Sequence, residues 1–430
     1  MLAGSCGPGD YPAPPRTMVG GRCRSDPKCQ RTRRLSGARP ASIECTMVDQ
    51  KESLGIQSIA SIHVFVRDLD RSRDHYVEHL DFSEVAVSSP DFEAENRARA
   101  SVVEAGSVRF VFMEPLGSRG ESFHWLERHP EGVGRVVFDV EDVKRAFRLV
   151  TERGATAITS IERRAVDGGV ASWFDIATAL GDTQFRFVQH TGKTPIMPDL
   201  VRLDSPRGGQ NRFGITHVDH VTTNFLTLQP ALAWMDRVMG FEPFWEIEFH
   251  TQDVKRGHFG GSGLKSVVMI DPHSGLKFAN NEPAQPCFKA SQIYLFYQDH
   301  RGAGVQHVAL GVRDLVSAVE ELKSRGASFM PTPDAYYDML PERLVDLGVN
   351  ELDEDIDILR DLDILVDGQA DHRYLLQIFM KDAATLFKDP QAGPLFIELI
   401  QRKGDEGFGH GNFRALFESI ERQQQLEGRA

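Results

Sequence analysis

One pattern of residues occurs twice in this chain, and it restricts the possible folds more than any other feature. Residues 133–155 read VGRVVFDVEDVKRAFRLVTERGA, and residues 305–327 read VQHVALGVRDLVSAVEELKSRGA. Each stretch predicts an apolar strand, an Asp that caps a helix, and an amphipathic helix that ends at Arg-Gly. Two further pairs of segments match in the same order. They are 61–82 with 218–241 and 184–192 with 395–404.

These matches divide the chain into two similar halves. Each half carries two strand–helix units followed by further strands. We therefore predict an α+β fold with two domains, each built from a duplicated βαβββ unit. A polar segment rich in Pro, Gly and Arg, residues 198–214, lies between the halves. We expect an N-terminal domain over 51–197, a linker over 198–214 and a C-terminal domain over 215–430.

The first 50 residues differ from both halves. They are rich in Gly, Pro and Arg, carry a local excess of basic residues and show no apolar periodicity. We therefore expect residues 1–50 to be a disordered tail. They lack the apolar core of a signal peptide, while a transit peptide or translated upstream sequence before Met47 stays open. Four of the five cysteines lie here, at Cys6, Cys23, Cys29 and Cys45. They form no CxxC pair of the kind that holds zinc.

Charge and composition exclude several classes of function. The formal net charge is -13 at pH 7, whereas nucleic-acid binding needs clustered Lys and Arg in excess. No stretch approaches the roughly 20 apolar residues of a membrane span, so we expect no membrane partner. Only Cys287 follows the tail. The folded part can therefore form no internal disulfide, which is typical of a protein in a reducing cytoplasm.

Comparison of the two halves identifies a candidate metal site. The matched strands carry two histidines and a glutamate in the C-terminal half, against a histidine and two arginines in the N-terminal half. These residues are His220, His307 and Glu398 against His63, Arg135 and Arg186. Two imidazoles and one carboxylate leave coordination positions open, as is typical of non-haem Fe(II) sites for oxygen chemistry. Zinc or manganese would accept similar ligands. A lone His in a strand is commonly a core residue, but three such residues at repeat-related positions favour a metal.

Several short motifs of the C-terminal half occur in an order that resembles a known family. They are DHVT (219–222), NNEP (280–283), SQI (291–293), GAGVQHVAL (302–310), YYDML (336–340), LLQIF (375–379), LFIELIQR (395–402) and GFGHGNFRALFESIE (407–421). The βαβββ duplication resembles the vicinal-oxygen-chelate superfamily. Within it, the motifs are similar to those of the 4-hydroxyphenylpyruvate dioxygenase family, and the resemblance extends from Gln57 to the end of the chain.

The resemblance implies a fold, a cofactor and a reaction. The C-terminal domain would form a half-open barrel that encloses one Fe(II) per chain, held by His220, His307 and Glu398. No added 2-oxoglutarate would be needed, because the substrate carries its own α-keto acid. The reaction would convert 4-hydroxyphenylpyruvate and O2 into homogentisate and CO2, a step of tyrosine and phenylalanine catabolism. A cytoplasmic homodimer or homotetramer is implied as well.

The resemblance also implies which side chains meet the substrate. The positions of catalytic amides are occupied by Asn281, Gln306 and Gln377, and the other substrate positions by Ser266, Gln292, Phe379, Phe408 and Phe413. Phe379 and Phe408 would cover the two faces of the ring, and Phe413 would belong to a lid that excludes water. Without the family, each amide would be an ordinary strand or surface residue. The chain departs from the family at Ala279, where Pro is usual, and by an inserted residue between Asn281 and Gln292.

Three other functions are compatible with parts of this pattern. A 4-hydroxymandelate synthase would use the same iron and substrate but oxidise the benzylic carbon, and Asn281 and Phe413 favour ring hydroxylation instead. A non-catalytic binding protein of the superfamily would not need an intact set of ligands, glutamines and phenylalanines. A ring-cleaving extradiol dioxygenase would need a His or Tyr acid–base group near the metal, and none occupies a matching position.

Overall fold

The computed structural model of the protein describes residues 51–166, 168–192, 197–250, 262–285, 288–349, 351–369, 373–409 and 411–412. Several predictions therefore lie outside the described residues. They concern the tail over 1–50 with its four cysteines, Cys287 and Phe413.

The N-terminal half contains two successive modules with the same order of elements. The first is β1 (Ile56–Phe65), α1 (Leu69–Glu78), β2 (Ser83–Ser88), α2 (Pro90–Asn96), β3 (Ala98–Ala105) and β4 (Val108–Pro115). After α3 (Glu121–Arg128), the second is β5 (Gly132–Val140), α4 (Val143–Glu152), β6 (Glu162–Val166), β7 (Gly169–Ala177) and β8 (Gln184–Gly192). Each module is a strand, a helix and three further strands, with α2 as an additional short helix in the first.

The C-terminal half repeats this order with longer connections. Its first module is β10 (Ile215–Asn224), α5 (Gln229–Trp234), the π-helix η1 (Met235–Met239), β11 (Glu242–His250), β12 (Gly263–Ile270) and β13 (Lys277–Pro283). The 3-10 helix η2 (Phe288–Ala290) and α6 (Gln292–His300) follow. The second module is β14 (Gly304–Val312), α7 (Leu315–Ser324), β15 (Leu365–Gln369), β16 (Arg373–Phe379) and β17 (Phe396–Lys403).

Short helices fill the connections of this last module. α8 (Asp334–Asp338), α9 (Leu340–Asp346) and α10 (Ile356–Asp361) precede β15, and α11 (Ala383–Phe387) and η3 (Pro390–Ala392) precede β17. The acidic stretch 341–366 forms most of α9, then α10, and ends inside β15. Among the described residues, every helix is too short or too polar to cross a membrane.

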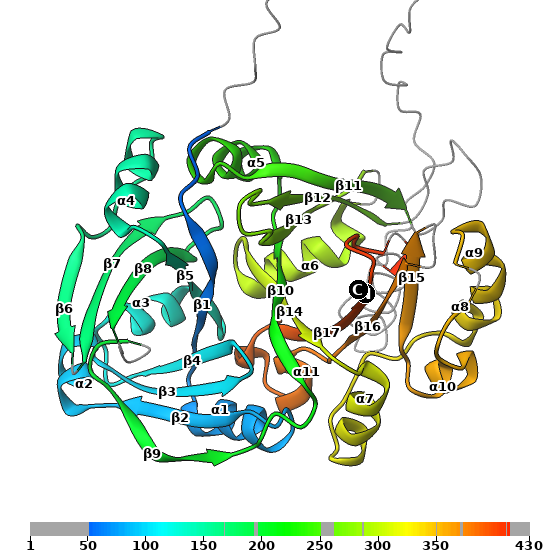
Figure 1. The fold of residues 1–430 in the computed structure, drawn as a ribbon, viewed down its shortest axis with the longest axis horizontal. Helices are drawn as coiled ribbons and strands as arrows, with labels where there is room; N and C mark the ends of the chain where they lie inside the picture. The colour runs from blue at the N-terminus through cyan, green and yellow to red at the C-terminus, as the bar shows by residue number, and fades with distance from the viewer. Residues whose placement is uncertain are drawn as a thin grey trace, which may run out of the picture. The chain divides into compact units, whose positions relative to one another are not determined.

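Strand pairing confirms the predicted duplication. The two sheets have the orders β6-β7-β8-β5-β1-β4-β3-β2-β9 and β11-β12-β13-β10-β14-β17-β16-β15. In every module the first strand pairs in parallel with the last, and the first strands of paired modules meet in antiparallel fashion at the centre. Figure 1 shows the two curved sheets, the N-terminal one in blue to green and the C-terminal one in green to red.

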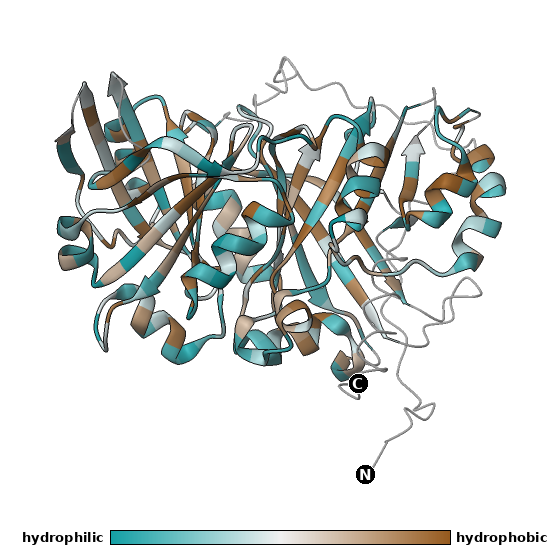
Figure 2. Cartoon of the chain, turned by 90° about the horizontal axis from the view of Figure 1, so that it is seen from below, coloured by the Kyte–Doolittle hydropathy of each residue, from teal (hydrophilic) through white to brown (hydrophobic). Residues whose placement is uncertain are grey.

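Local sequence explains why the helices begin where they do. Asp68, Asp142 and Asp314 are the N-caps of α1, α4 and α7, and each carboxylate accepts a hydrogen bond from a backbone N–H of the first turn. The helix α4 then buries one side against the sheet, at Val143, Ala146, Leu149 and Val150. Figure 2 shows the resulting pattern, with brown hydrophobic residues along the strands of both sheets.

The two halves share one hydrophobic core. Phe278 of β13 lies 5.7 Å from Phe185 of β8 and 6.4 Å from Phe138 of β5, measured between ring centroids. All three rings are buried in the same cluster. Because apolar area removed from water dominates folding energy, we expect the two halves to fold as one cooperative unit.

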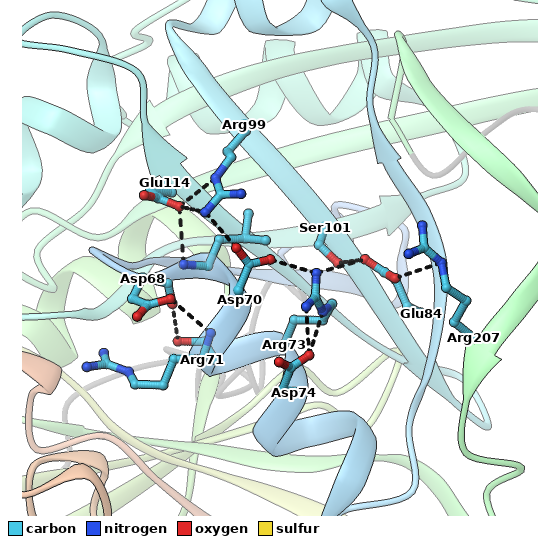
Figure 3. A network of polar contacts seen from close by, with 12 residues as sticks. Asp68, Asp70, Arg71, Arg73, Asp74, Glu84, Arg99, Ser101, Glu114 and Arg207 are labelled. Carbon is cyan, nitrogen blue, oxygen red and sulfur yellow. Dashed lines mark hydrogen bonds and ion pairs between the residues drawn. The ribbon is translucent and has the colours of Figure 1, made fainter.

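The segment expected to be a linker contributes a further strand. β9 (Leu200–Gly208) lies within residues 198–214 and pairs in antiparallel fashion with β2 at the edge of the first sheet. A polar network accompanies this edge (Figure 3). There Arg207 of β9 contacts the buried Glu84 of β2 at 3.4 Å, Ser101 of β3 donates to Glu84 at 2.8 Å, and Arg99 bridges Asp70 of α1 and Glu114 of β4.

Candidate metal centre

Strand register brings the three predicted ligands together. On the second sheet β10, β14 and β17 are neighbours. His220 of β10 pairs with Ala309 of β14, and Ala309 pairs in turn with Glu398 of β17. His307 lies two residues before Ala309 on the same strand and therefore projects from the same face. The two outer ligands thus face each other across the small side chain of Ala309, with His307 beside them.

The ligand atoms lie within coordinating distance of a common point. Nε2 of His220 is 3.3 Å from Oε2 of Glu398, and Nε2 of His307 is 3.1 Å from the same oxygen. All three ligand atoms lie within 4.8 Å of one another, and all three residues are buried. In the part of the chain that the structure describes, no other group of His, Cys, Asp or Glu side chains meets this condition.

Each ligand is held from behind by a second polar side chain. Nδ1 of His220 lies 2.8 Å from Oδ1 of Asp219, and Nδ1 of His307 lies 3.2 Å from Oε1 of Gln306. With a carboxylate and an amide oxygen as acceptors, both histidines carry the proton on Nδ1 and turn Nε2 toward the site. Nε2 of Gln377 donates to Oε1 of Glu398 at 2.8 Å, which leaves Oε2 for the site.

The charges of these groups suit a cation. Burial alone would raise the pKa of Glu398, but His220 and His307 outweigh burial and lower that pKa to about 2. Burial lowers the pKa of His307, and this effect exceeds the opposite influence of Glu398. Burial acts in the same sense on His220, where Glu398 and Asp219 outweigh it and raise the pKa. The site therefore combines an ionised carboxylate with at least one neutral imidazole.

These features fit a divalent first-row metal. Two imidazole nitrogens and one carboxylate oxygen converge in a buried site, which is the ligand set of non-haem Fe(II) centres with open positions. The hydrogen bonds on the far sides of the ligands are the kind of support that metal-binding histidines and carboxylates need. His220, His307 and Glu398 could thus hold a metal ion.

The first sheet shows what the same fold does with other residues. Arg135 pairs with Gln184 and Val137 with Arg186, as His307 pairs with Phe396 and Ala309 with Glu398. The predicted matches of His307 with Arg135 and of Glu398 with Arg186 therefore agree with the register. Arg186 binds Asp175 at 2.7 Å and Arg135 binds Glu121 at 2.5 Å, so both guanidinium groups are neutralised inside the protein.

The third predicted match is wrong by two residues. His220 pairs with Ala309. The counterpart of Ala309 in the first sheet is Val137, and Val137 pairs with Ser61. Ser61 is therefore the counterpart of His220. His63 pairs with Arg135, which makes it the counterpart of Thr222, the partner of His307. Sequence matching missed this shift because residues two apart in a strand project from the same face.

A row of buried polar groups lies on the neighbouring strands. Ser266 of β12 pairs with Asn281 of β13, and Asn281 pairs with Asn224 of β10. Nδ2 of Asn281 donates to Oδ1 of Asn224 at 3.0 Å. Among the described residues, Oγ of Ser266, Oδ1 of Asn281, Nδ2 of Asn224 and Oγ1 of Thr222 are buried without a hydrogen-bond partner. Such groups normally have partners, so this row favours a polar ligand.

Comparisons with known proteins agree with this geometry. Two family profiles described as the Glyoxalase/Bleomycin resistance protein/Dioxygenase superfamily match residues 58–176 and 219–339. The 4-hydroxyphenylpyruvate dioxygenase of Coccidioides posadasii is 33% identical over 388 residues, which cover 85% of this chain and 93% of that protein. The enzyme of that name from Dictyostelium discoideum is 33% identical over 362 residues, with 82% and 94% covered. The chain belongs to the 4-hydroxyphenylpyruvate dioxygenase family. It is accordingly an oxidoreductase of the dioxygenase class.

Solved structures include a close relative of this family. A triple mutant of 4-hydroxymandelate synthase from Streptomyces coelicolor superposes with a TM-score of 0.71 at 27% sequence identity. The alignment covers 86% of this chain and 99% of that one. This chain thus shares its overall fold with that enzyme.

Further predicted residues, among those that the structure describes, lie beside the candidate ligands or their partners. Phe408 packs edge-on against His220, with ring centroids 4.7 Å apart, and Phe379 lies 6.1 Å from His307. Gln292, the first residue of α6, accepts a hydrogen bond of 3.1 Å from Gln306. Ala279, where the family usually has Pro, packs in one buried cluster with Val268 and Phe408. Phe413 lies outside the described residues.

Several residues of the site were not predicted from the sequence. Asp219 is hydrogen-bonded to His220 and is held in turn by Arg402. Asn412 is hydrogen-bonded to Gln377 and is held in turn by Tyr336. Phe396 stacks on His307, with ring centroids 4.7 Å apart. Asp219 directly precedes His220, so a search for a carboxylate partner of the imidazole would have found it. The others are joined to the ligands only by the folded chain.

Proposed function

We propose that the chain converts 4-hydroxyphenylpyruvate and O2 into homogentisate and CO2, with one Fe(II) per chain held by His220, His307 and Glu398. This reaction belongs to the breakdown of tyrosine and phenylalanine. One observation carries the proposal. In a chain of this family, two imidazoles and one ionised carboxylate converge in a buried site. When bound, Fe(II) would supply the activation of O2 that is coupled to loss of CO2 from the keto acid.

The ligand residues and their partners would hold the metal in a fixed orientation. Asp219 and Gln306 keep the protons of the two imidazoles on Nδ1, so that Nε2 of each ring remains a ligand. Gln377 occupies one oxygen of Glu398, so that this carboxylate would bind through the other. Three protein ligands leave room for the keto-acid group of the substrate and for O2.

The polar row and the aromatic side chains would bind the rest of the substrate. Ser266 and Asn281 offer buried polar atoms without partners among the described residues, which would meet polar groups of the substrate without competing for the metal. Gln292 and Gln306 form a bonded amide pair next to His307. Phe379 and Phe408 would supply apolar faces for the ring, and Phe413 would close the site against water.

Product identification tests the proposal. The metal-free protein is reconstituted anaerobically with Fe(II), mixed with 4-hydroxyphenylpyruvate and O2, and the aromatic product is identified by chromatography and mass. We expect homogentisate, with formation lost in His307→Ala. His124→Ala is a matched control, since His124 lies on α3 of the N-terminal half with its side chain 63% exposed to solvent. Absence of both turnover and metal binding in the unmodified protein would refute the proposal.

The similarity to 4-hydroxymandelate synthase supports a second candidate function. The superposition covers 99% of that enzyme's chain. In addition, Ala279, which differs from the Pro that is usual in the family, packs against Phe408 in one buried cluster. Hydroxymandelate as the product would assign the benzylic reaction, with the same metal ligands. A non-catalytic binding protein would be indicated if the ligand set binds metal and keto acid but yields no product.

We also propose how the chain is organised in the cell. The N-terminal domain, residues 51–197, would be metal-free and structural, the segment 198–214 would join it to the catalytic domain over 215–430, and residues 1–50 would be a tail. The chain would act in the cytoplasm as a homodimer or homotetramer. Light scattering of the purified protein and of N-terminal surface variants would test the assembly, and fractionation would test the compartment.

A further inference from the structure

A β-bulge lies directly beside the metal ligand His220. On β10, Val218 pairs with Leu310 and His220 pairs with Ala309, so Asp219 is an additional residue without its own partner on β14. Bulges turn a side chain away from the regular alternation of a strand. Here the carboxylate of Asp219 reaches Nδ1 of His220 at 2.8 Å, which neighbours in a regular strand could not do.

Arg402 holds this carboxylate in a two-pronged ion pair. Its Nε lies 2.6 Å from Oδ2 of Asp219 and its Nη2 lies 2.7 Å from Oδ1. The Asp219 side chain is 5% exposed and that of Arg402 is 19% exposed, so the pair is largely screened from water. Planar two-pronged contacts of this kind fix both partners in orientation as well as in position.

The same guanidinium holds the turn that carries Phe408. Nη1 of Arg402 donates to the backbone oxygens of Asp405 and Gly407, at 3.0 and 2.7 Å. Phe408 follows immediately and packs against the ring of His220 at 4.7 Å. Arg402 therefore supports His220 in two ways, through Asp219 at Nδ1 and through the Phe408 ring against its edge.

The N-terminal half serves as an internal comparison. It repeats the bulge, because Ile59 pairs with Phe138 and Ser61 pairs with Val137, which leaves Ala60 as the additional residue. Ala60 therefore corresponds to Asp219. Arg186 of β8 is the counterpart of Glu398. His190 lies as far beyond Arg186 as Arg402 lies beyond Glu398, so His190 corresponds to Arg402. The fold thus needs the bulge but not the ion pair, which occurs only where the metal ligands are.

We infer that Asp219 and Arg402 form a positioning unit that couples the metal ligand His220 to the Phe408 wall of the substrate site. The inference rests on the proposed function in taking His220 as a metal ligand. The unit fixes the imidazole with Nε2 toward the metal and fixes Phe408 at the same time. Loss of either member is expected to weaken metal binding, and loss of Arg402 is expected to weaken substrate binding further through the freed turn.

Metal affinity without turnover tests the unit. Metal-free protein is titrated with Co(II) in a calorimeter, for the unmodified chain and for Asp219→Asn, Arg402→Gln and the double variant. We expect each single variant to bind Co(II) about 10–100-fold more weakly. The double variant should lose little more than either single one, because the two side chains act as one unit. Arg402→Lys keeps the charge but not the two-pronged geometry, so its loss should be intermediate.

A neighbouring ion pair supplies the control. Lys403 binds Asp353 at 2.9 Å and contacts Glu354, away from the ligands. Lys403→Gln should leave the Co(II) affinity unchanged. In Co(II)-loaded protein under anaerobic conditions, 4-hydroxyphenylpyruvate should bind more weakly to Arg402→Gln than to Asp219→Asn. Circular dichroism of each variant confirms folding, and if Arg402→Gln fails to fold, the comparison is made with Arg402→Lys.

The outcomes separate this inference from the proposed function. Unchanged Co(II) affinity in the folded Asp219 and Arg402 variants would overturn the inference, and so would an equal loss in Lys403→Gln or strictly additive losses in the double variant. If the unmodified chain binds no Co(II), the metal site itself is refuted. If it binds Co(II) normally but makes no homogentisate, only the proposed reaction fails, and the positioning unit is still judged by the affinities.

Discussion

Gln377 donates a hydrogen bond of 2.8 Å to Oε1 of Glu398, and the same side chain accepts one of 2.9 Å from Asn412. Oδ1 of Asn412 in turn accepts a bond of 2.7 Å from the hydroxyl of Tyr336, which lies beneath the guanidinium of Arg343. A chain of hydrogen bonds, buried at its Glu398 end, thus runs from a candidate metal ligand through Asn412 to helix α9.

Removal of the Gln377 amide should loosen Glu398. Gln377→Leu leaves Oε1 of the carboxylate buried without its donor, which costs about 1–3 kcal/mol in such settings. We expect the metal-induced rise in the thermal unfolding midpoint to shrink markedly in this variant. Asn412→Ala keeps the bond between Gln377 and Glu398, so a smaller decrease is expected. Equal metal-induced stabilisation in all three proteins would contradict this account.

Residue type and repeat were sufficient to predict which three side chains of the C-terminal half come together. His220, His307 and Glu398 lie on repeat-matched strands. The N-terminal half has Arg135 and Arg186 at the positions of His307 and Glu398, and this difference in charge favours a cation in the C-terminal half. The fold class followed from the same repeat. Two of the matched pairs of segments form a strand followed by a helix, and the third pair forms the last strands β8 and β17.

Hydrogen-bond register and long-range contacts could not be predicted in the same way. Ser61 and His63 project from one face of β1, and only pairing with β5 shows which corresponds to His220. The bulge at Asp219 depends on the partner strand. The expected linker forms β9 because Arg207 and the backbone find partners on β2, far away in the sequence.

The small side chain at position 309 should be necessary for the metal site. Ala309 separates His220 from Glu398 in the strand register, and its counterpart in the N-terminal half is Val137. Ala309→Val would add two methyl groups between the ligands in a close-packed interior, where added volume displaces neighbours. We expect metal affinity to fall at least tenfold, about 1.4 kcal/mol, in a calorimetric titration. Ala309→Gly adds no volume and should retain binding; a similar loss there would argue against a steric cause.

Asn281 should affect the substrate rather than the metal. Its described hydrogen bond is with Asn224, and its Oδ1 is buried without a partner among the described residues. Asn281→Leu removes the polar atom that would face the substrate, and a lost buried hydrogen bond corresponds to about 1–3 kcal/mol. We expect roughly 10–100-fold weaker binding of 4-hydroxyphenylpyruvate at unchanged metal affinity, both measured anaerobically. Weaker metal binding with normal substrate binding would refute this role.

Asp81 should stabilise the junction between the two halves. Its buried carboxylate accepts hydrogen bonds from Arg212, from the backbone of Gln210 and from Arg325 of the α7 C-cap. Asp81→Ala removes hydrogen bonds from charged donors to a buried carboxylate, and such a bond contributes about 1.5–3 kcal/mol. Denaturant unfolding should show this loss in the free energy of unfolding. Asp81→Asn keeps the side-chain oxygen and tolerates the positive φ of 57° at this position, so it should lose less.

Acid should destabilise the protein through His300. This imidazole is buried between the halves, with Nδ1 at 3.1 Å from the carbonyl oxygen of Gly302 and Nε2 without a partner among the described residues. Burial, with a smaller contribution from His129, lowers its pKa to about 4. In the unfolded chain the pKa returns to about 6.5. The unfolded state therefore binds one proton more between these values, so stability from this group is complete above pH 6.5 and decreases as the pH falls toward 4.

The free energy of unfolding at pH 7.5 and pH 5.0 measures this contribution. Over the interval from 6.5 to 5.0, one proton corresponds to a loss of about 2 kcal/mol. The unmodified protein should lose that much more stability than His300→Gln, which carries no titrating ring. His217→Gln, at an exposed position on β10, should follow the unmodified protein. Protonation of His300 would place a charge beside His129 in a buried site. If the stability of His300→Gln and of the unmodified protein changes equally with pH, the ring is not shielded from water and the prediction is wrong.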